Sequence, residues 1–255
     1  MQIKGKTILI TGGASGIGLE AVKQFLANGA SVIITGRNQG KLDDAKKLYP
    51  AIIAIKSDVS EADDAQKLFN QVQQLGGIDI LYNNAGVLTD PINLGISNGQ
   101  HFEDAEYEMN VNYLGVIRLN NLFIDMLKSR KESAIINTTS LLSYVPSLLE
   151  ATYSASKVAL QFYTKSLRKH LQILNSSVKV FELLPPLVAT DMTTDMNGKK
   201  MSAADMVKDF IAGLQKDKLT IRIGDTKTVY ILNRLFPKMV FNLANPKKSY
   251  KVISQ

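Results

Sequence analysis

The stretch that decides the fold is Lys6-Thr-Ile-Leu-Ile-Thr11, followed directly by Gly12-Gly-Ala-Ser-Gly-Ile-Gly18. Its first half is short, apolar and rich in β-branched residues, which predicts a buried strand. An amphipathic run then continues to Asn28-Gly29, where the glycine predicts the end of a helix. A strand, a glycine turn and a helix form a dinucleotide site when backbone N–H groups approach a pyrophosphate. The spacing G-x-x-x-G-x-G differs from G-x-G-x-x-G, so this pattern alone also permits an ordinary tight turn.

The alternation of strand and helix repeats along the chain. Apolar runs predict further strands at 31–35, 52–55, 78–82, 134–138 and 178–184, and a last one at 220–224. Between them we expect a helix from an N-cap at Ser60 to Leu75, and a long helix from about Phe102 to Ser129. This order predicts a single α/β domain over residues 1–255, a Rossmann-type doubly wound parallel sheet with helices on both faces.

Composition narrows the possible functions. There is no cysteine, and His101 and His170 are isolated, so we expect no disulfide and no metal site. The N-terminal apolar run is too short for a signal peptide and no stretch is long enough to span a bilayer, so we expect a cytoplasmic protein. Residues 199–255 hold twelve Lys/Arg and four Asp/Glu, so the chain's net charge of +7 belongs to this part. It contains no recognised nucleic-acid module, and we expect no nucleic-acid partner.

The turn after the second strand reads Gly36-Arg37-Asn38. An acidic residue near this point binds the ribose 2′-OH of NAD, whereas an arginine accommodates the 2′-phosphate of NADP. Glycine stands in the acid's place and Arg37 follows it, so the sequence favours NADP(H). A solvated arginine in a turn is the alternative.

Ser140, Tyr153 and Lys157 could perform proton transfer. Tyr153 and Lys157 are four residues apart and precede an apolar periodic run, which places them on one face of a helix. An ammonium about 4 Å from a phenol, at an effective dielectric near 20, favours the phenolate by roughly 4 kcal/mol before desolvation. We therefore expect Lys157 to bring the Tyr153 pKa towards neutrality. Taken alone, the pair could equally be neighbours on a surface helix.

Several of these segments lie just past the ends of predicted strands, where open α/β sheets bind ligands. They are Gly12–Gly18, Arg37, Asn84–Gly86, Ser140 and Pro185. Asn110 and Asn112 add an unusual feature, since asparagine is unfavourable inside a helix. We expect one of them to have a function, although two solvated asparagines are an alternative.

In this order and spacing, the motifs resemble those of the short-chain dehydrogenase/reductase family over about residues 5 to 195. The matching elements are Thr11–Gly18, Asp58-Val59, Asn83–Gly86, Asn112–Gly115, Ser140, Tyr153–Lys157 and Pro185–Thr190. The resemblance implies an oxidoreductase that transfers a hydride between a nicotinamide cofactor and a small carbonyl or alcohol substrate. Homodimers or homotetramers are usual in that family.

The resemblance also implies roles for single residues. Tyr153 would be the general acid or base, Lys157 would lower its pKa and bind the ribose, Ser140 would bind the substrate oxygen, and Asn112 would hold a water in a proton relay. Asp58 and Val59 would contact the adenine, Asn84, Ala85 and Gly86 the cofactor, and Val188 and Thr190 the carboxamide. The full predicted cofactor set is Gly12, Ser15, Gly16, Ile17, Gly18, Arg37, Asn38, Asp58, Val59, Asn84, Ala85, Gly86, Tyr153, Lys157, Pro185, Val188 and Thr190.

One departure concerns the segment after the sixth strand, where the family usually shows Pro-Gly. This chain has Pro185-Pro186, and a second proline removes an N–H group and fixes φ. Pro185-Pro-Leu-Val188, with Ile221-Arg-Ile-Gly224, resembles the subgroup of oxidoreductases associated with bacterial D-alanyl–lipoteichoic acid operons. That resemblance specifies no substrate.

The C-terminal third leaves alternatives open. Residues 190–224 are expected to form a substrate lid and the last strand, and 225–255 a basic extension. The methionine-containing segment 190–202 suits a lid, although an ordinary loop is an equal alternative. Basic and apolar residues in the extension could contact an anionic membrane surface, or form a solvated or subunit-contacting helix. A cofactor-binding regulatory protein without turnover is a further alternative.

Overall fold

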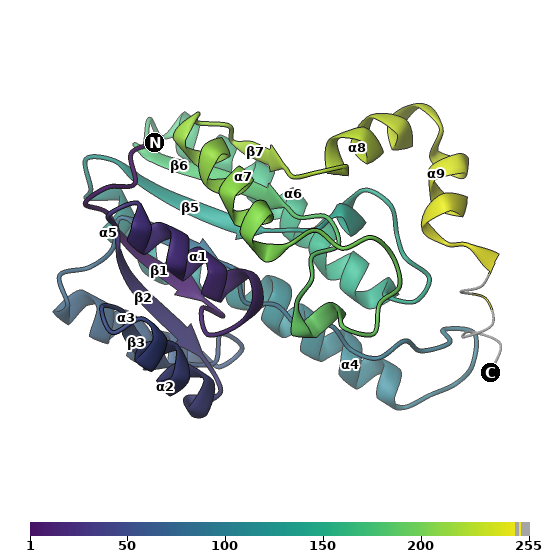
Figure 1. Ribbon diagram of the computed structural model, residues 1–255, viewed down its shortest axis with the longest axis horizontal. Coiled ribbons are helices and arrows are strands. Elements are labelled where there is room, and N and C mark those ends of the chain that lie inside the picture. Colours follow the sequence, from purple (N-terminus) through teal and green to yellow (C-terminus); the bar gives the residue numbers. More distant parts are fainter. Residues whose placement is uncertain (248–249, 251–255) are drawn as a thin grey trace.

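The computed structural model describes residues 1–247 and residue 250. Seven parallel strands form one sheet in the order β3-β2-β1-β4-β5-β6-β7 (Figure 1). Helices cover both faces, so the predicted doubly wound α/β fold is confirmed. The strands are β1 Thr7–Thr11, β2 Ser31–Gly36, β3 Ile53–Lys56, β4 Ile80–Asn83, β5 Ser133–Thr138, β6 Val178–Leu184 and β7 Thr220–Arg222.

One helix separates successive strands, except that two lie between β4 and β5, and the last two helices form the extension at the upper right of Figure 1. The described helices are α1 Gly16–Ala27, α2 Gln39–Leu48, α3 Ala62–Gln74, α4 Gln100–Met109, α5 Gly115–Lys128, α6 Ala151–Ile173, α7 Ala203–Gln215, α8 Thr226–Leu235 and α9 Pro237–Ala244. Helix α2 was not predicted because only Leu42 and Ala45 of its ten residues are buried, which leaves a weak apolar period.

Strand residues alternate between two hydrophobic cores. Ile8 and Ile10 of β1 face the core beneath α1, α2 and α7, whereas Leu9 faces the core beneath α3, α5 and α6. This alternation follows from the two-residue period of a strand, and both faces being buried explains the continuous apolar runs in the sequence. The order β2-β1-β4 places the point where the winding reverses between β1 and β4, which is where such sheets bind ligands.

Two predicted helices differ in detail from the structure. Helix α3 has Glu61 rather than Ser60 as its N-cap, because the Ser60 hydroxyl is bound to Asp58 Oδ1 at 2.7 Å. The long helix predicted over 102–129 is α4 and α5, joined by a π-helical turn over Asn110–Leu114.

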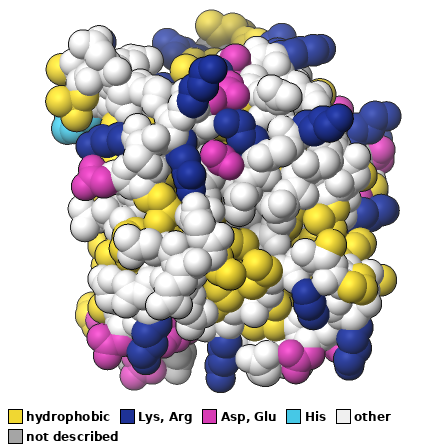
Figure 2. Space-filling model, turned by 90° about the vertical axis from the view of Figure 1, so that its left-hand side faces the viewer, with side chains coloured by type: hydrophobic (Ala, Val, Ile, Leu, Met, Phe, Trp, Pro, Cys, Tyr) yellow, Lys and Arg dark blue, Asp and Glu magenta, His cyan; other side chains and the backbone are white. Residues whose placement is uncertain are grey.

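The amino ends of the strands form an edge linked by ion pairs. The Met1 ammonium and Lys179 Nζ each lie 2.9 Å from Asp217 Oδ1, and Lys179 is also 3.3 Å from Glu132. Lys6 extends this series of ion pairs, since its Nζ lies 3.8 Å from Glu132 Oε2. Figure 2 views the molecule from this side and shows basic and acidic side chains close together, with hydrophobic ones between them. We call this set of ion pairs the amino-edge network.

The extension after β7 begins with α8 and α9. Ile231, Leu235, Phe236 and Leu243 are exposed on these helices. Residues 248–249 and 251–255, the remainder of the predicted extension, lie outside the described residues. Among the described residues, no helix is both long and apolar enough to cross a membrane.

Candidate active site

The turn between β1 and α1 forms the first part of the site. Gly12 has a φ of +63°, and a Cβ atom on Gly18 would lie 2.2 Å from the Gly12 carbonyl oxygen. Only glycine lets the helix start this close to the strand. Ser15 is the N-cap, yet within the described chain it makes no side-chain capping bond, and the first turn of α1 holds no acidic residue. These uncapped N–H groups fit the pyrophosphate of a dinucleotide.

The turn after β4 is bound to the end of β1. Thr11 Oγ1 accepts hydrogen bonds from the N–H groups of Asn84 at 3.0 Å and Ala85 at 2.9 Å. The Asn84 side chain donates to the Thr11 carbonyl oxygen at 3.0 Å. The predicted segment Asn84–Gly86 is thus held beside the glycine turn, and Thr11 is a positioning residue that the predicted site lacked.

Arg37 lies at the far end of the same edge, beside Asp58. Its Nε atom is 3.8 Å from Asp58 Oδ2, and its guanidinium donates a hydrogen bond to the Tyr107 hydroxyl. Half of the Arg37 side chain is exposed, which leaves guanidinium N–H groups accessible to a ligand. Asn38 has a structural role, since its Oδ1 accepts a hydrogen bond from Lys41 N at 3.0 Å and caps α2.

Lys157 and Asn112 both lie beside Gly86, in the turn after β4. A Cβ atom on Gly86 would lie 3.2 Å from Asn112 Oδ1 and 3.5 Å from Lys157 Nζ. Lys157 is 3% exposed, and its Nζ donates to the carbonyl oxygen of Thr138 at 3.0 Å. The structure therefore brings together three residues that are far apart in the sequence.

The Asn112 side chain is fully buried, and both of its polar atoms have hydrogen-bond partners. Its Oδ1 accepts from Val87 N at 2.9 Å, and its Nδ2 donates to Val87 O at 3.0 Å and to Ser156 Oγ at 3.1 Å. Asn112 lies within the π-helical turn, a distortion that often marks functional positions in helices. Asn110 is only partly buried, so Asn112 is the one of the two asparagines whose side chain lies inside the protein.

Tyr153 is one helical turn before Lys157 on α6, with Lys157 Nζ 5.5 Å from its ring centroid. Part of the Tyr153 surface is exposed, but its hydroxyl is densely surrounded, and this burial raises the pKa of Tyr153 to about 12. A hydrogen bond with Ser140 lowers that pKa, and the charges of Glu108 and Glu150 raise it. Burial lowers the pKa of Lys157 to about 8, while Glu108 raises it.

These values correct one expectation. Lys157 does not bring the Tyr153 pKa towards neutrality in this structure, because burial of the phenol dominates and the ammonium is bound to the Thr138 carbonyl. Tyr153 is therefore protonated at neutral pH, the state in which a phenol donates a proton.

The segment after β6 contacts both the turn after β5 and the start of α1. The Pro185 carbonyl oxygen accepts a hydrogen bond from Leu141 N at 3.2 Å, which joins the turns after β5 and β6. Thr190 lies against the start of α1, since a Cβ atom on Gly16 would be 3.2 Å from the Thr190 methyl carbon. A bridge between Val188 and Met201 closes the intervening residues into a loop.

The sequence reasoning also missed Glu108, on α4. This carboxylate is 1% exposed and its charge acts on both Tyr153 and Lys157. One sequence signal was available. Glu108 lies four residues before Asn112, on the same face of a helix that packs against α6, and a side chain on that face is expected to be buried.

Comparison with known proteins identifies the family. A model of the family described as short chain dehydrogenase matches residues 6–201, most of the chain. The chain belongs to the short-chain dehydrogenase family. It is 32% identical over 228 residues to an uncharacterized oxidoreductase, DltE, of Bacillus subtilis, covering 87% of this chain and 89% of the relative. A 3alpha-hydroxysteroid dehydrogenase of Mediterraneibacter gnavus is 32% identical over 201 residues, covering 75% and 77%.

Solved structures of short-chain dehydrogenases share the fold. One from Burkholderia cenocepacia, in complex with NADP, has a TM-score of 0.84 and 26% identity, with 96% of this chain and 99% of that chain covered. One from Burkholderia phymatum, in complex with NAD, has a TM-score of 0.82 and 20% identity, with 94% and 96% covered. The chain is thus an oxidoreductase of this family with a nucleotide-binding Rossmann-type fold.

Proposed function

We propose that this short-chain dehydrogenase is an NADP(H)-dependent carbonyl reductase or alcohol dehydrogenase that acts on a small carbonyl or alcohol substrate. The observation that carries the proposal is the group formed by Ser140, Tyr153, Lys157 and Asn112 beside the uncapped start of α1. When bound, the cofactor supplies or accepts the hydride, and the protein residues place the substrate and move the proton.

Tyr153 acts as the proton donor in the direction of reduction. It is protonated at neutral pH, as an ordinary tyrosine is, and an alkoxide that forms as the carbonyl is reduced is more basic than a phenolate. Ser140 lies next to the Tyr153 hydroxyl, so both hydroxyls can bind one carbonyl oxygen and stabilise its developing charge.

Lys157 and Asn112 form the buried part of this site. Lys157 places a positive charge near the phenol, which favours transient formation of the phenolate when the proton leaves. Asn112 fixes the segment at Val87 and Gly86 against Lys157. Loss of Asn112 would therefore release the segment after β4, which lies beside Lys157.

The preference for NADP(H) rests on Arg37 and on the missing acid at Gly36. The Arg37 guanidinium is held at the end of β2 by Asp58 and Tyr107, and half of the side chain is accessible. A planar guanidinium binds a phosphate through two parallel hydrogen bonds, which the ribose 2′-hydroxyl of NAD does not offer.

The region 190–224, predicted to hold a substrate lid and the last strand, also contains a helix of the core. Helix α7 buries Met206, Phe210 and Leu214 in the core beside α1, so it belongs to the domain. We place the substrate lid in residues 190–202 alone. This segment is attached by the Val188–Met201 bridge and contains a glycine, Gly198, with a φ of +132°.

The test combines cofactor binding with turnover. Fluorescence titration of the wild type and of Arg37→Gln with NADPH and NADH measures the preference, and oxidation of NADPH over a panel of small ketones and aldehydes measures activity. Tighter binding of NADPH than NADH by the wild type, with a ratio that falls about tenfold in Arg37→Gln, is expected from the loss of a charge-assisted pair. Tyr153→Phe should lower kcat by about 10²–10⁴-fold with little change in NADPH affinity.

Each alternative has its own outcome. Binding of NADPH without turnover on the panel would favour a regulatory protein that retains the fold. Equal affinity for both cofactors would contradict the role of Arg37. Activity that survives in Tyr153→Phe would contradict the assignment of the proton donor.

A further inference from the structure

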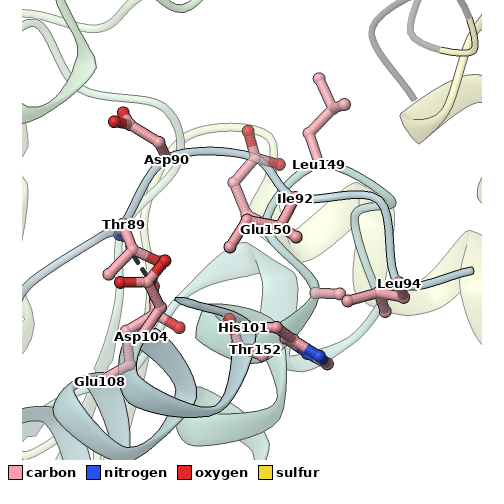
Figure 3. A pocket seen from close by; sticks show the side chains of 11 residues that line it. Thr89, Asp90, Ile92, Leu94, His101, Asp104, Glu108, Leu149, Glu150 and Thr152 are labelled. Atoms are coloured by element: carbon pink, nitrogen blue, oxygen red, sulfur yellow. Dashed lines mark hydrogen bonds between the residues drawn. The ribbon is translucent and has the colours of Figure 1, made fainter. Parts of the chain in front are cut away.

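A small pocket lined by carboxylates lies where α6 begins, at the residues directly before Tyr153. Glu108 and Asp104 reach it from α4, Asp90 from the segment after β4, and Glu150 from the segment before α6 (Figure 3). We call this space the acidic pocket. Its central space measures about 10 Å³, which suits one water-sized group.

Glu108 shows that the pocket has an unfilled polar requirement. Its Oε1 accepts hydrogen bonds from Thr89 N at 2.9 Å and Thr89 Oγ1 at 3.0 Å, which Figure 3 shows as a contact at the pocket wall. Its Oε2 has no hydrogen-bond partner among the described residues, although the side chain is 1% exposed. A buried carboxylate without a complete set of partners costs several kcal/mol, so a cationic group in the pocket would be strongly favoured.

The basic groups of the region do not supply a hydrogen bond to Glu108 Oε2, although the charges of Lys157 and Glu108 attract each other. Lys157 is bound to the Thr138 carbonyl oxygen, and the His101 ring, which also lines the pocket, points away from the carboxylates (Figure 3). Among the described residues, no group of three or more His, Cys, Asp or Glu has an arrangement that could hold a metal ion. An organic cation is therefore the better match.

The position of the acidic pocket connects it to the substrate. Ala151 and Thr152 line it and directly precede Tyr153 in the chain. We propose that the acidic pocket binds the ammonium group of the substrate, so that the enzyme reduces small amino ketones or oxidises the corresponding amino alcohols. The inference rests on the proposed carbonyl-reductase function, which it makes more specific.

A bound ammonium would also assist proton transfer. Glu108 and Glu150 raise the pKa of Tyr153, and a positive charge beside them would oppose that effect and make the phenol a stronger acid. Ammonium substrates should therefore gain in kcat as well as in KM.

The test uses a pair of ketones of the same shape. Aminoacetone carries an ammonium where butan-2-one carries a methyl group, and longer amino ketones with their neutral counterparts extend the comparison to other chain lengths. The wild type should show a kcat/KM at least about tenfold higher for the cationic member of the best pair, as expected for one charge-assisted contact. Glu108→Gln, which keeps an oxygen for Thr89, and Asp104→Asn should each reduce this ratio.

Glu103→Gln is the matched control, because Glu103 is exposed on the same helix and makes the same change in net charge. It should leave the ratio unchanged. A structural role of Glu108 alone would lower kcat/KM equally for both ketones, and that result would overturn the proposal. Equal kcat/KM values of the wild type for the neutral and the cationic ketone would also overturn the proposal, although the proposed reductase function would stand.

A second measurement does not depend on turnover. Ethylammonium chloride at about 50 mM should raise the Tm of the wild type relative to sodium chloride at the same concentration, and the increase should disappear in Glu108→Gln. Stabilisation without reduction of any ketone would support the acidic pocket and contradict the proposed function. Absence of both stabilisation and turnover would overturn both.

Discussion

The two edges of the sheet use charge in opposite ways. At the amino ends of the strands, Lys179 is paired with both Asp217 and Glu132, and the hydrogen bond to Asp217 raises the pKa of Lys179. At the carboxyl ends, Lys157 is buried beside a carbonyl oxygen, and burial lowers its pKa to about 8. Glu108, near Lys157, keeps an oxygen without a partner in the described chain.

The difference separates structural charges from functional ones. A charge that is paired with oppositely charged neighbours contributes only to the stability of the fold. A buried charge that lacks hydrogen-bond or ionic partners lowers that stability, and such groups are often found at functional sites. Changes at the carboxyl edge should therefore affect activity strongly, and some should stabilise the protein. Changes at the amino edge should have small effects on stability alone.

The largest expected effect comes from Gly18→Ala. The added Cβ atom would lie 2.2 Å from the Gly12 carbonyl oxygen and 2.7 Å from Asn84 Nδ2, so the start of α1 must move away from the strand. We expect a loss of about 3 kcal/mol in the free energy of unfolding and a large loss of NADPH affinity. Urea denaturation and fluorescence titration would measure these effects.

Gly99→Ala is the matched control for this substitution. Gly99 has a φ of −60°, and no atom lies within 4 Å of its Cβ position among the described residues. It should retain wild-type stability and affinity. Equal behaviour of the two variants would show that the glycine turn is not closely packed.

Ser140→Ala should give the next largest effect. In the proposed mechanism the Ser140 hydroxyl stabilises charge on the substrate oxygen, so its removal should lower kcat by about 100-fold. Ser143→Ala is the control, because the Ser143 hydroxyl accepts a hydrogen bond from Ser140 N at 3.4 Å in the same turn. If both variants lost activity equally, the turn rather than the Ser140 hydroxyl would be required.

The sequence predicted those parts of the carboxyl edge that depend on local spacing. Gly12 and Gly18 are set by the strand-to-helix turn, and Tyr153 and Lys157 by one turn of a helix. The pKa of Tyr153 was predicted in the wrong direction, because the extent of burial depends on elements distant in the sequence. Glu108 was missed for the same reason.

Helix ends and isolated helices were the other weak points. The sequence pattern placed an N-cap at Ser60, but the hydroxyl of Ser60 binds Asp58, and the choice between these local hydrogen bonds has no clear sequence signal. Helix α7 lies in the region 190–224, for which the sequence pattern predicted only a lid and a last strand, and its apolar side chains pack in the core beside α1. That placement depends on tertiary packing.

Lys157→Met tests the cost of a buried charge. With a folded-state pKa of about 8 and an ordinary value of 10.5, the Lys157 ammonium opposes folding below pH 8 by about 3 kcal/mol. Part of this is offset because the Thr138 carbonyl loses its donor, so we expect the variant to be more stable by about 2 kcal/mol at pH 7 and nearly inactive.

The pH dependence identifies the cause. Between pH 8 and 10.5 folded Lys157 binds fewer protons than the unfolded chain, so wild-type stability rises with pH in this range and the advantage of the variant shrinks. Urea denaturation from pH 7 to 10 would measure this trend. A variant that is less stable at pH 7 would show that the hydrogen bond to Thr138 outweighs the burial of charge.

Lys179→Met at the amino edge should have the opposite sign and the smallest effect. Lys179 is bound to two carboxylates but is a third exposed, so we expect a loss of at most about 1 kcal/mol. The Lys179 ammonium holds the pKa of Asp217 below its ordinary value of 3.8, so this contribution is present above that pH and is lost on further acidification. Lys128→Met, which removes a single exposed pair with Asp125, should change nothing measurable. A loss of 2 kcal/mol or more for Lys179→Met would show that the amino-edge network acts as a unit. The changes in unfolding free energy at the two edges would then be similar in size and opposite in sign.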